Sequence, residues 1–108
     1  MRRGEVWSVS GSGHAGKPRP AVISQVDRFD ATASVTVCVF ATDKTEAPLF
    51  RIRISPGDAN GPRTESRLMV DKITTVPKDR LGERIGRLDD ADMVRLDRAI
   101  LVFLGLAQ

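Results

Sequence analysis

The apolar residues of this chain fall into short alternating segments, separated by breaks rich in glycine and proline, and only one long helical stretch follows them. In the segment 49–54 the alternation predicts that Ile52 and Ile54 face inward while Arg51 and Arg53 face outward. A period of two residues is typical of strands, and strands this short must pair with several neighbours to bury an apolar face. The chain is therefore expected to consist mainly of β-structure.

Strands are predicted at 5–10, 20–26, 34–41, 49–54 and 67–76, and the last of them is expected to bend near Asp71 and Lys72. A short helical turn is predicted at 78–81, and Ile85 lies in a brief segment before the final helix. This order predicts a mainly β or α+β protein in which a curved antiparallel sheet or small barrel precedes a C-terminal helix.

The C-terminal helix has a clear beginning and an unusual end. Asp89 is a candidate N-cap, and the apolar stripe that follows comprises Met93, Leu96, Ile100 and Phe103. Beyond Ala99 the helix becomes apolar on nearly every side. Such an end needs a cover, either from its own domain or from a second copy of the chain, and in so small a domain we expect the second copy.

The 108 residues carry a net charge of +3 and allow one domain, spanning 1–108. Residues 1–70 hold ten Lys and Arg against seven Asp and Glu, and residues 71–108 hold seven of each, so the excess lies in the first part. A basic excess favours a polyanionic partner, but +3 alone is weak evidence, and an ordinary solvated surface is the better explanation for it.

The composition excludes several classes of protein. Cys38 is the only cysteine, so an intrachain disulfide and a cysteine-cluster zinc site are excluded, and a buried packing role in a reducing cytoplasm is expected. No spacing of His, Asp and Glu indicates a metal site, and no fingerprint indicates a cofactor. The sequence has no signal-peptide pattern, and its longest apolar run is too short for a membrane span.

A glycine-rich loop over 11–17 carries the only histidine, and three cationic candidates lie close together here: His14, Lys17 and Arg19. The backbone of Arg19 is restricted because prolines flank it on both sides, and a guanidinium fixed in this way can bind phosphate oxygens. The alternatives are a solvated hairpin loop with incidental charge and a structural salt bridge for Arg19.

Two further polar residues stand at informative places. Thr42 follows the predicted third strand, where its hydroxyl could donate to a phosphate, although threonine is common at strand ends. Asp71 interrupts an apolar run, so its carboxylate is expected to have a dedicated partner. It is either a ligand for RNA bases or an anchor for the neighbouring loops, and the run favours the anchor.

Several motifs occur together in one order along almost the whole chain, and as a set they resemble the MazF/PemK toxin family. They are Arg3-Gly4-Glu5-Val6-Trp7, Gly16-Lys17-Pro18-Arg19-Pro20-Ala21-Val22-Ile23, Thr42, Asn60-Gly61-Pro62, Ser66 to Val76, Arg80-Leu81-Gly82, Ile85-Gly86-Arg87-Leu88 and Leu104-Gly105-Leu106. Each motif alone is modest, whereas the ordered set is specific.

The resemblance implies an SH3-like small barrel and a toxin that cleaves single-stranded RNA at short sequences without a metal or cofactor. It implies attack by the 2′-hydroxyl, leaving a 2′,3′-cyclic phosphate and a 5′-hydroxyl, with Arg19 and Thr42 as the catalytic pair. A homodimer with RNA in a groove across both subunits is implied, as is an antitoxin that covers this groove. RNA contacts are expected from Lys17, Asp43, Lys44 and Asp71.

Two positions depart from the family pattern. His14 stands where many members carry a glutamate, and we expect it to assist proton transfer because its pKa suits that role near neutral pH. Met69 replaces an arginine of some members, which would leave Asp71 without a partner used elsewhere. The alternatives are a CcdB-type toxin that binds gyrase and cuts nothing, and a non-catalytic SH3-like module, which the low aromatic content disfavours.

Overall fold

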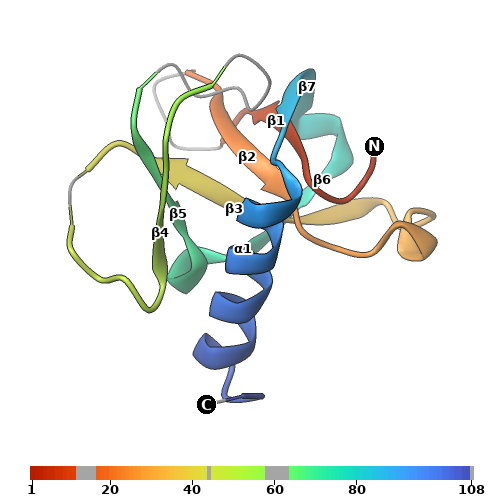
Figure 1. Cartoon of the computed structure of the whole chain (residues 1–108). Helices are drawn as coiled ribbons and strands as arrows, with labels where there is room; N and C mark the ends of the chain where they lie inside the picture. Colours follow the sequence, from red (N-terminus) through yellow and green to blue (C-terminus); the bar gives the residue numbers. More distant parts are fainter. Residues whose placement is uncertain (12–16, 44, 58–63, 108) are drawn as a thin grey trace.

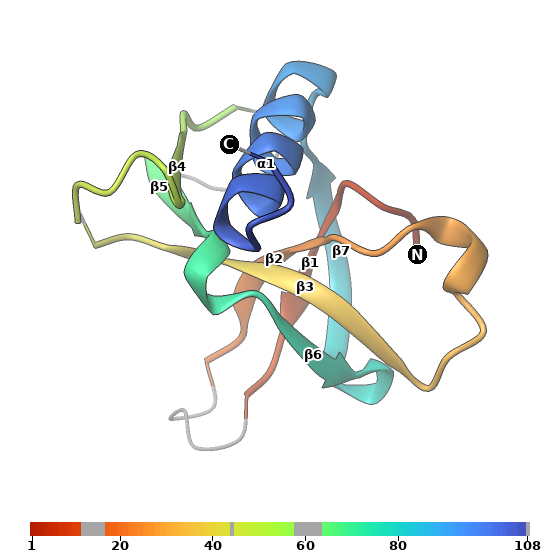
Figure 2. The same cartoon turned by 90° about the horizontal axis from the view of Figure 1, so that it is seen from below.

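The computed structural model describes residues 1–11, 17–43, 45–57 and 64–107. An antiparallel sheet forms the body of the protein, and one helix lies across one of its faces (Figures 1 and 2). The strands are β1 (Glu5–Val9), β2 (Arg19–Ile23), β3 (Ser34–Ala41), β4 (Arg51–Ile54), β5 (Ser66–Met69), β6 (Thr74–Pro77) and β7 (Leu81–Arg87). The helix α1 spans Asp90–Phe103, and 3-10 turns occupy Asp27–Phe29, Val70–Lys72 and Lys78–Arg80.

The strands pair in the order β4-β5-β3-β2-β1-β7, and β6 pairs with the first half of β3. β3 therefore holds two neighbours on one side: β6 along Ser34–Val37 and β5 at Phe40 and Ala41. The bend predicted near Asp71 is confirmed, since the 3-10 turn Val70–Lys72 separates β5 from β6. The curved sheet and the C-terminal helix are confirmed as well, and the sheet stays open, with β4 and β7 at the ends of its path in the described part of the chain.

Two apolar clusters lie on opposite faces of the sheet. The first lies beneath α1, where Leu96 and Ala99 pack with strand residues such as Val22 and Ile54. The second lies on the other face and is built from Val9, Ala21, Ile23, Val35 and Val37. Because both faces of β2 and β3 are covered, these strands read as nearly continuous apolar runs.

The helix begins as the sequence predicts. The Asp89 side chain accepts a hydrogen bond of 2.8 Å from the backbone N–H of Asp92, which satisfies one of the free donors of the first turn. Leu96 is fully buried, while Phe103 is half-exposed and its ring lies tilted against that of Phe50, with 5.8 Å between the ring centroids. No helix in the described ranges has the length and apolar character needed to cross a membrane.

Several predicted elements differ from the structure in their bounds. The second strand ends at Ile23 rather than Val26, because the backbone N–H of Thr36 in β3 donates to the Gln25 side chain and not to the backbone of the second strand. The fourth begins at Arg51, because the N–H groups of Phe50 and Arg51 both donate to the carbonyl of Ala47 in a turn. The segment around Ile85 is a seven-residue strand, β7, paired with β1.

Candidate functional site

Arg19 and Thr42 lie at the same end of two neighbouring strands. Arg19 is the first residue of β2, Thr42 directly follows the last residue of β3, and these strands are antiparallel. The register pairs Ala21 with Val39, so continuing it by two residues brings Arg19 opposite Ala41. Side chains two residues apart on a strand share a face, so Arg19 and Ala41 lie on the face opposite α1.

The Arg19 side chain is exposed and lines a cavity of about 190 Å³. The other lining residues come from β1 and the segment directly after it, from β3 and β6, and from the turn before β7: Val9, Ser10, Gly11, Val39, Thr74, Val76 and Arg80. Within the described ranges Arg19 forms no ion pair, so the alternative of a structural salt bridge gains no support there. No described carboxylate therefore competes with an anion for its donors.

Thr42 and Asp43 begin the loop between β3 and β4, and both side chains are exposed. The Asp43 carboxylate accepts a hydrogen bond of 3.2 Å from the backbone N–H of Thr45, forming a turn directly after Thr42. This bond, together with the charge of Arg51, lowers the pKa of Asp43. Thr42 does not line the Arg19 cavity in the described part of the chain, so a phosphate would have to bridge the strand ends to touch both.

Asp71 has a dedicated partner, as the interrupted apolar run predicts. Arg51 Nε donates to Asp71 Oδ1 at 2.7 Å, and Arg51 Nη2 donates to Oδ2 at 3.0 Å. This two-point ion pair lowers the pKa of Asp71 and raises that of Arg51. Met69 does not supply this partner; an arginine from β4, Arg51, pairs with Asp71 instead.

The prediction that Arg51 points outward into solvent is also wrong. Alternation placed it correctly on the face opposite α1, yet its side chain is only 9% exposed, against 56% for Arg53 two residues later. Asp71 covers Arg51 from the 3-10 turn and Asp43 lies 3.6 Å from its Nη1 atom. The alternation of a strand predicts on which face of the sheet a side chain lies, but it does not predict whether another segment of the chain covers that face.

A second buried arginine lies on the same face. Arg67 of β5 pairs in register with Ala41 of β3 and Arg53 of β4, and its side chain is 5% exposed. It lies 3.2 Å from a carboxylate oxygen of Glu46 and 3.9 Å from one of Glu65. This end of the sheet therefore combines several arginines with carboxylates that offset part of their charge.

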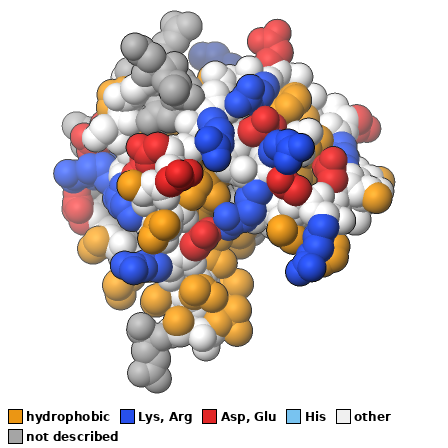
Figure 3. Space-filling model, turned by 45° about the vertical axis from the view of Figure 1, so that its right-hand side comes forward, with side chains coloured by type: hydrophobic (Ala, Val, Ile, Leu, Met, Phe, Trp, Pro, Cys, Tyr) orange, Lys and Arg blue, Asp and Glu red, His pale blue; other side chains and the backbone are white. Residues whose placement is uncertain are grey.

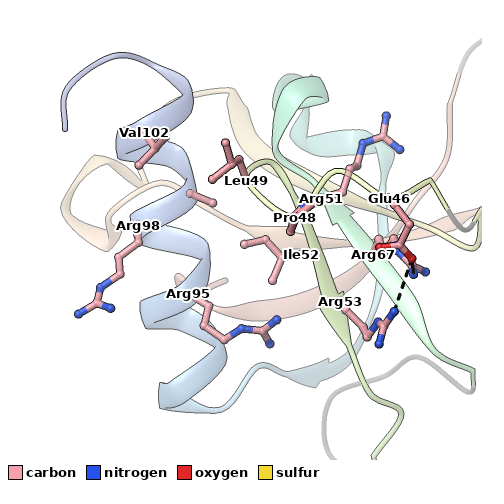
Figure 4. A pocket seen from close by; sticks show the side chains of 11 residues that line it. Glu46, Pro48, Leu49, Arg51, Ile52, Arg53, Arg67, Arg95, Arg98 and Val102 are labelled. Atoms are coloured by element: carbon pink, nitrogen blue, oxygen red, sulfur yellow. Dashed lines mark hydrogen bonds and ion pairs between the residues drawn. The ribbon is translucent and has the colours of Figure 1, made fainter. Parts of the chain in front are cut away.

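A further cavity, of about 490 Å³, lies between the edge of the sheet and α1 (Figure 4). Its lining residues are Glu46, Pro48, Leu49, Arg51, Ile52, Arg53, Arg67, Arg95, Arg98, Ala99 and Val102. Figure 4 shows the guanidinium of Arg51 turned away from the helix and that of Arg98 turned away from the strands. The cavity thus lies on the helix side, apart from Arg19.

The remaining predicted site residues divide into two groups. Lys17 is exposed and makes no ion pair in the part of the chain that the structure describes. His14 and Lys44 lie outside the described residues.

Sequence reasoning missed two arginines as site residues. Arg80 lies in the 3-10 turn before β7 and lines the same cavity as Arg19, which no local pattern could indicate. Arg51 stands in the regular alternation of β4, and only its pairing with a carboxylate 20 residues away distinguishes it.

The fold and this site together define a class: a small open antiparallel sheet, covered by a helix on one face, with an arginine-bearing rim suited to phosphate on the other. The chain belongs to the PemK-like, MazF-like toxin family of type II toxin–antitoxin systems, whose family model matches residues 2–104.

Named relatives agree with this assignment. The chain is 59% identical over 108 residues to a probable endoribonuclease MazF of Mycolicibacterium smegmatis, covering 99% of both proteins. It is 31% identical to the endoribonuclease EndoA of Bacillus subtilis, over 98% of this chain and 96% of that protein. A solved endoribonuclease bound to its cognate antitoxin, from a mycobacterial species, superposes with a TM-score of 0.82 at 28% identity, covering 100% of this chain and 98% of that one.

Proposed function

We propose that this chain is the toxin of a type II toxin–antitoxin pair and an endoribonuclease that cleaves single-stranded RNA at short sequences without a metal ion. Curated relatives that match nearly its whole length are named endoribonucleases, which favours this function over the gyrase-binding alternative. The observation that carries the proposal is the placement of an exposed Arg19, which forms no ion pair with a described residue, beside the strand end that leads into Thr42.

The proposed reaction uses the RNA as its own nucleophile. The 2′-hydroxyl loses its proton and attacks the neighbouring phosphorus, and the bond from phosphorus to the 5′-oxygen breaks. The 5′-oxygen takes a proton, which leaves a 2′,3′-cyclic phosphate and a 5′-hydroxyl. Arg19 is suited to stabilise the negative charge that grows on the phosphate oxygens, and Thr42 is suited to donate a hydrogen bond to one of them.

Arginine is a poor base because its pKa is very high, so proton removal needs another group. We assign this role to His14. Replacing it with alanine should lower the rate and remove the limb of the pH–rate profile that reports the imidazole. An unchanged profile and rate would rule out the assignment.

RNA contacts are proposed for Lys17, Asp43, Lys44 and Asp71. The lysines supply positive charge for the backbone, and a carboxylate can accept a hydrogen bond from the amino group of a base.

Incubation of a long RNA with the purified protein in EDTA tests the function directly. Discrete cuts with 5′-hydroxyl ends are expected, and Arg19→Ala should lower the cleavage rate by about 100-fold or more, as for loss of a charge-stabilising donor.

Thr42→Val should also lower the cleavage rate, whereas Thr42→Ser, which keeps the hydroxyl, should retain most of that rate. Arg28→Ala, an exposed arginine in the turn Asp27–Phe29, is the matched control. Intact RNA alongside binding to gyrase would contradict the proposal.

We also propose two protein partners. A second copy of the chain is expected to cover the apolar end of α1, where hydrophobic side chains gather in Figure 3. A cognate antitoxin is expected to bind over the RNA site, in line with the antitoxin complex of the similar solved structure. Co-expression of the cognate antitoxin should suppress both RNA cleavage and the growth arrest that this cleavage causes.

A further inference from the structure

Arg51 connects two segments that are far apart in the sequence. Its guanidinium makes the two-point pair with Asp71 in the turn Val70–Lys72, and its remaining nitrogen, Nη1, lies 3.6 Å from Asp43 in the loop after β3. Nη1 is buried and donates no hydrogen bond to any described residue. One buried cation therefore lies between two carboxylates, and Asp43 is the one that faces its free donor.

Backbone hydrogen bonds reinforce this connection. The N–H of Arg51 donates to the carbonyl of Ala47 at 2.7 Å, which closes the end of the loop that begins at Thr42. The N–H of Val70 donates to the carbonyl of Phe50 at 2.9 Å, which joins the start of β4 to the turn that carries Asp71. The loop and the turn are thus held to each other at Arg51 by both main chain and side chain.

The exposures of the three side chains show which of them a ligand can reach. Asp43 is 58% exposed and Asp71 is 22% exposed, whereas Arg51 is only 9% exposed. The guanidinium lies behind the carboxylates, and the carboxylates keep open oxygen lone pairs toward solvent. A carboxylate oxygen accepts hydrogen bonds from the amino groups of nucleobases, so this arrangement presents acceptors to a base edge.

The negative charge of the two carboxylates explains why an arginine is needed behind them. Two carboxylates beside a bound sugar-phosphate chain would repel it, and the repulsion is strong where water is partly excluded. A guanidinium directly behind them offsets the charge of one carboxylate without occupying the surface that a base would use.

We propose that Arg51 is a positioning residue for RNA recognition: it holds the Asp43 and Asp71 carboxylates on either side of its guanidinium and offsets part of their charge, so that together they read amino groups on the bases of the cleaved sequence. The inference rests on the proposed function, because it takes these carboxylates as RNA contacts. Arg51 acts through them and does not touch the phosphate that is cut.

Kinetics on short RNAs, with single-base changes around the cut, test the role of Arg51. In Arg51→Met, KM for the preferred sequence should rise about 10-fold or more while kcat changes less than about 3-fold, because binding contacts are lost and the reacting groups stay. Discrimination against changed bases should fall by a similar factor, as for loss of one base contact. Arg51→Lys, which keeps the charge but cannot make the two-point pair, should fall in between.

Arg53→Met is the matched control, since Arg53 lies on the same strand and the same face but is 56% exposed and pairs with Glu46 and Glu65. It should keep the wild-type KM and sequence preference. If Arg51→Met does not fold, Arg51→Lys carries the test alone. Wild-type KM and wild-type preference in the folded Arg51 variant would overturn the inference, whereas failure of the wild-type protein to cut any RNA would overturn the proposed function instead.

Discussion

Asp71 and Arg51 form the one two-point ion pair among the described residues, and it stabilises the fold as well as the candidate site. Arg51 hydrogen-bonds the charged form of the carboxylate and so holds its pKa below the ordinary value. A group whose pKa is lowered on folding stabilises the protein above its unfolded-state pKa, and this contribution is lost as the pH falls through the lowered folded-state value.

The stability of Asp71→Asn should therefore depend less on pH than that of the wild-type protein. Below about pH 5 the wild-type free energy of unfolding should fall more steeply, because the unfolded Asp71 carboxyl has the higher pKa and takes up a proton that the folded ion pair does not. At neutral pH the variant should be less stable by about 2 kcal/mol, the cost of removing one partner of a charged hydrogen bond. Urea unfolding across this range measures both quantities, with the exposed Asp79→Asn as control. If the free energies of unfolding of the wild type and of Asp71→Asn fell with equal slopes toward acid pH, this account would be contradicted.

Cys38 is a packing residue, and its thiol should be unreactive in the folded protein. It lies fully buried in the cluster beneath α1, and burial raises the pKa of the thiol to about 12, with a smaller contribution from the charge of Asp71. The thiolate is the reactive form, so alkylation at neutral pH should be negligible until the protein unfolds. Mass spectrometry after iodoacetamide treatment, with and without denaturant, measures this. Rapid labelling of the native protein would show that the core opens readily.

At the scale of single elements, α1 depends on its first turn. Asp89 accepts the N–H of Asp92, and no basic residue offsets the negative end of the dipole in the last turn. Asp89→Ala should lower the free energy of unfolding by about 1 kcal/mol, the usual effect of losing an N-cap. Thermal unfolding monitored by circular dichroism checks it, and Asp89→Asn, which keeps the capping oxygen, should remain close to wild type. Equal losses in both variants would show that charge, rather than capping, is what matters.

The elements differ in how far sequence could predict them. β1 and α1 matched closely because their apolar residues recur with the period of a strand or a helix, and β3 matched because a polar segment bounds its apolar run at each end. β7 was underestimated because most of its residues are exposed polar groups or glycine, and its pairing with β1 decides its conformation. The intrinsic propensities of these residues do not reveal that β1 is available as a pairing strand.

The candidate site shows the same division. The rim position of Arg19 could be predicted, because flanking prolines and a following apolar run place it at the start of a strand. The Arg51–Asp71 pair could not, since the two residues belong to segments whose approach depends on the order of strands in the sheet. The motif that carries Asp71 was recognised from the sequence, whereas the residue that holds its carboxylate was not.

At the scale of the whole molecule, the exposed end of α1 is the feature that one copy of the chain does not explain. Leu101, Val102, Phe103, Leu104 and Leu106 are each between 36% and 71% exposed. Contiguous apolar surface of this kind on a small protein marks an interface. A second copy is the simplest cover, because a twofold dimer brings the same patch from both subunits together.

Charge placed on this surface should therefore separate the subunits without unfolding them. Leu104→Glu and Leu106→Glu change side chains that are 55% and 71% exposed in the single chain, so neither should weaken the fold of the subunit itself. In analytical ultracentrifugation the wild-type protein is expected to have a mass of twice 11.8 kDa. The double variant is expected to have a mass of 11.8 kDa and an unchanged circular dichroism spectrum. Val26→Glu, a change at an exposed apolar position away from the helix, should leave the protein a dimer.

If the RNA groove spans both subunits, the separated subunits should also lose cleavage activity while each keeps Arg19 and Thr42 intact. A wild-type protein that sediments as a single chain, or a double variant that stays dimeric, would show that something other than a second copy covers this end of the helix.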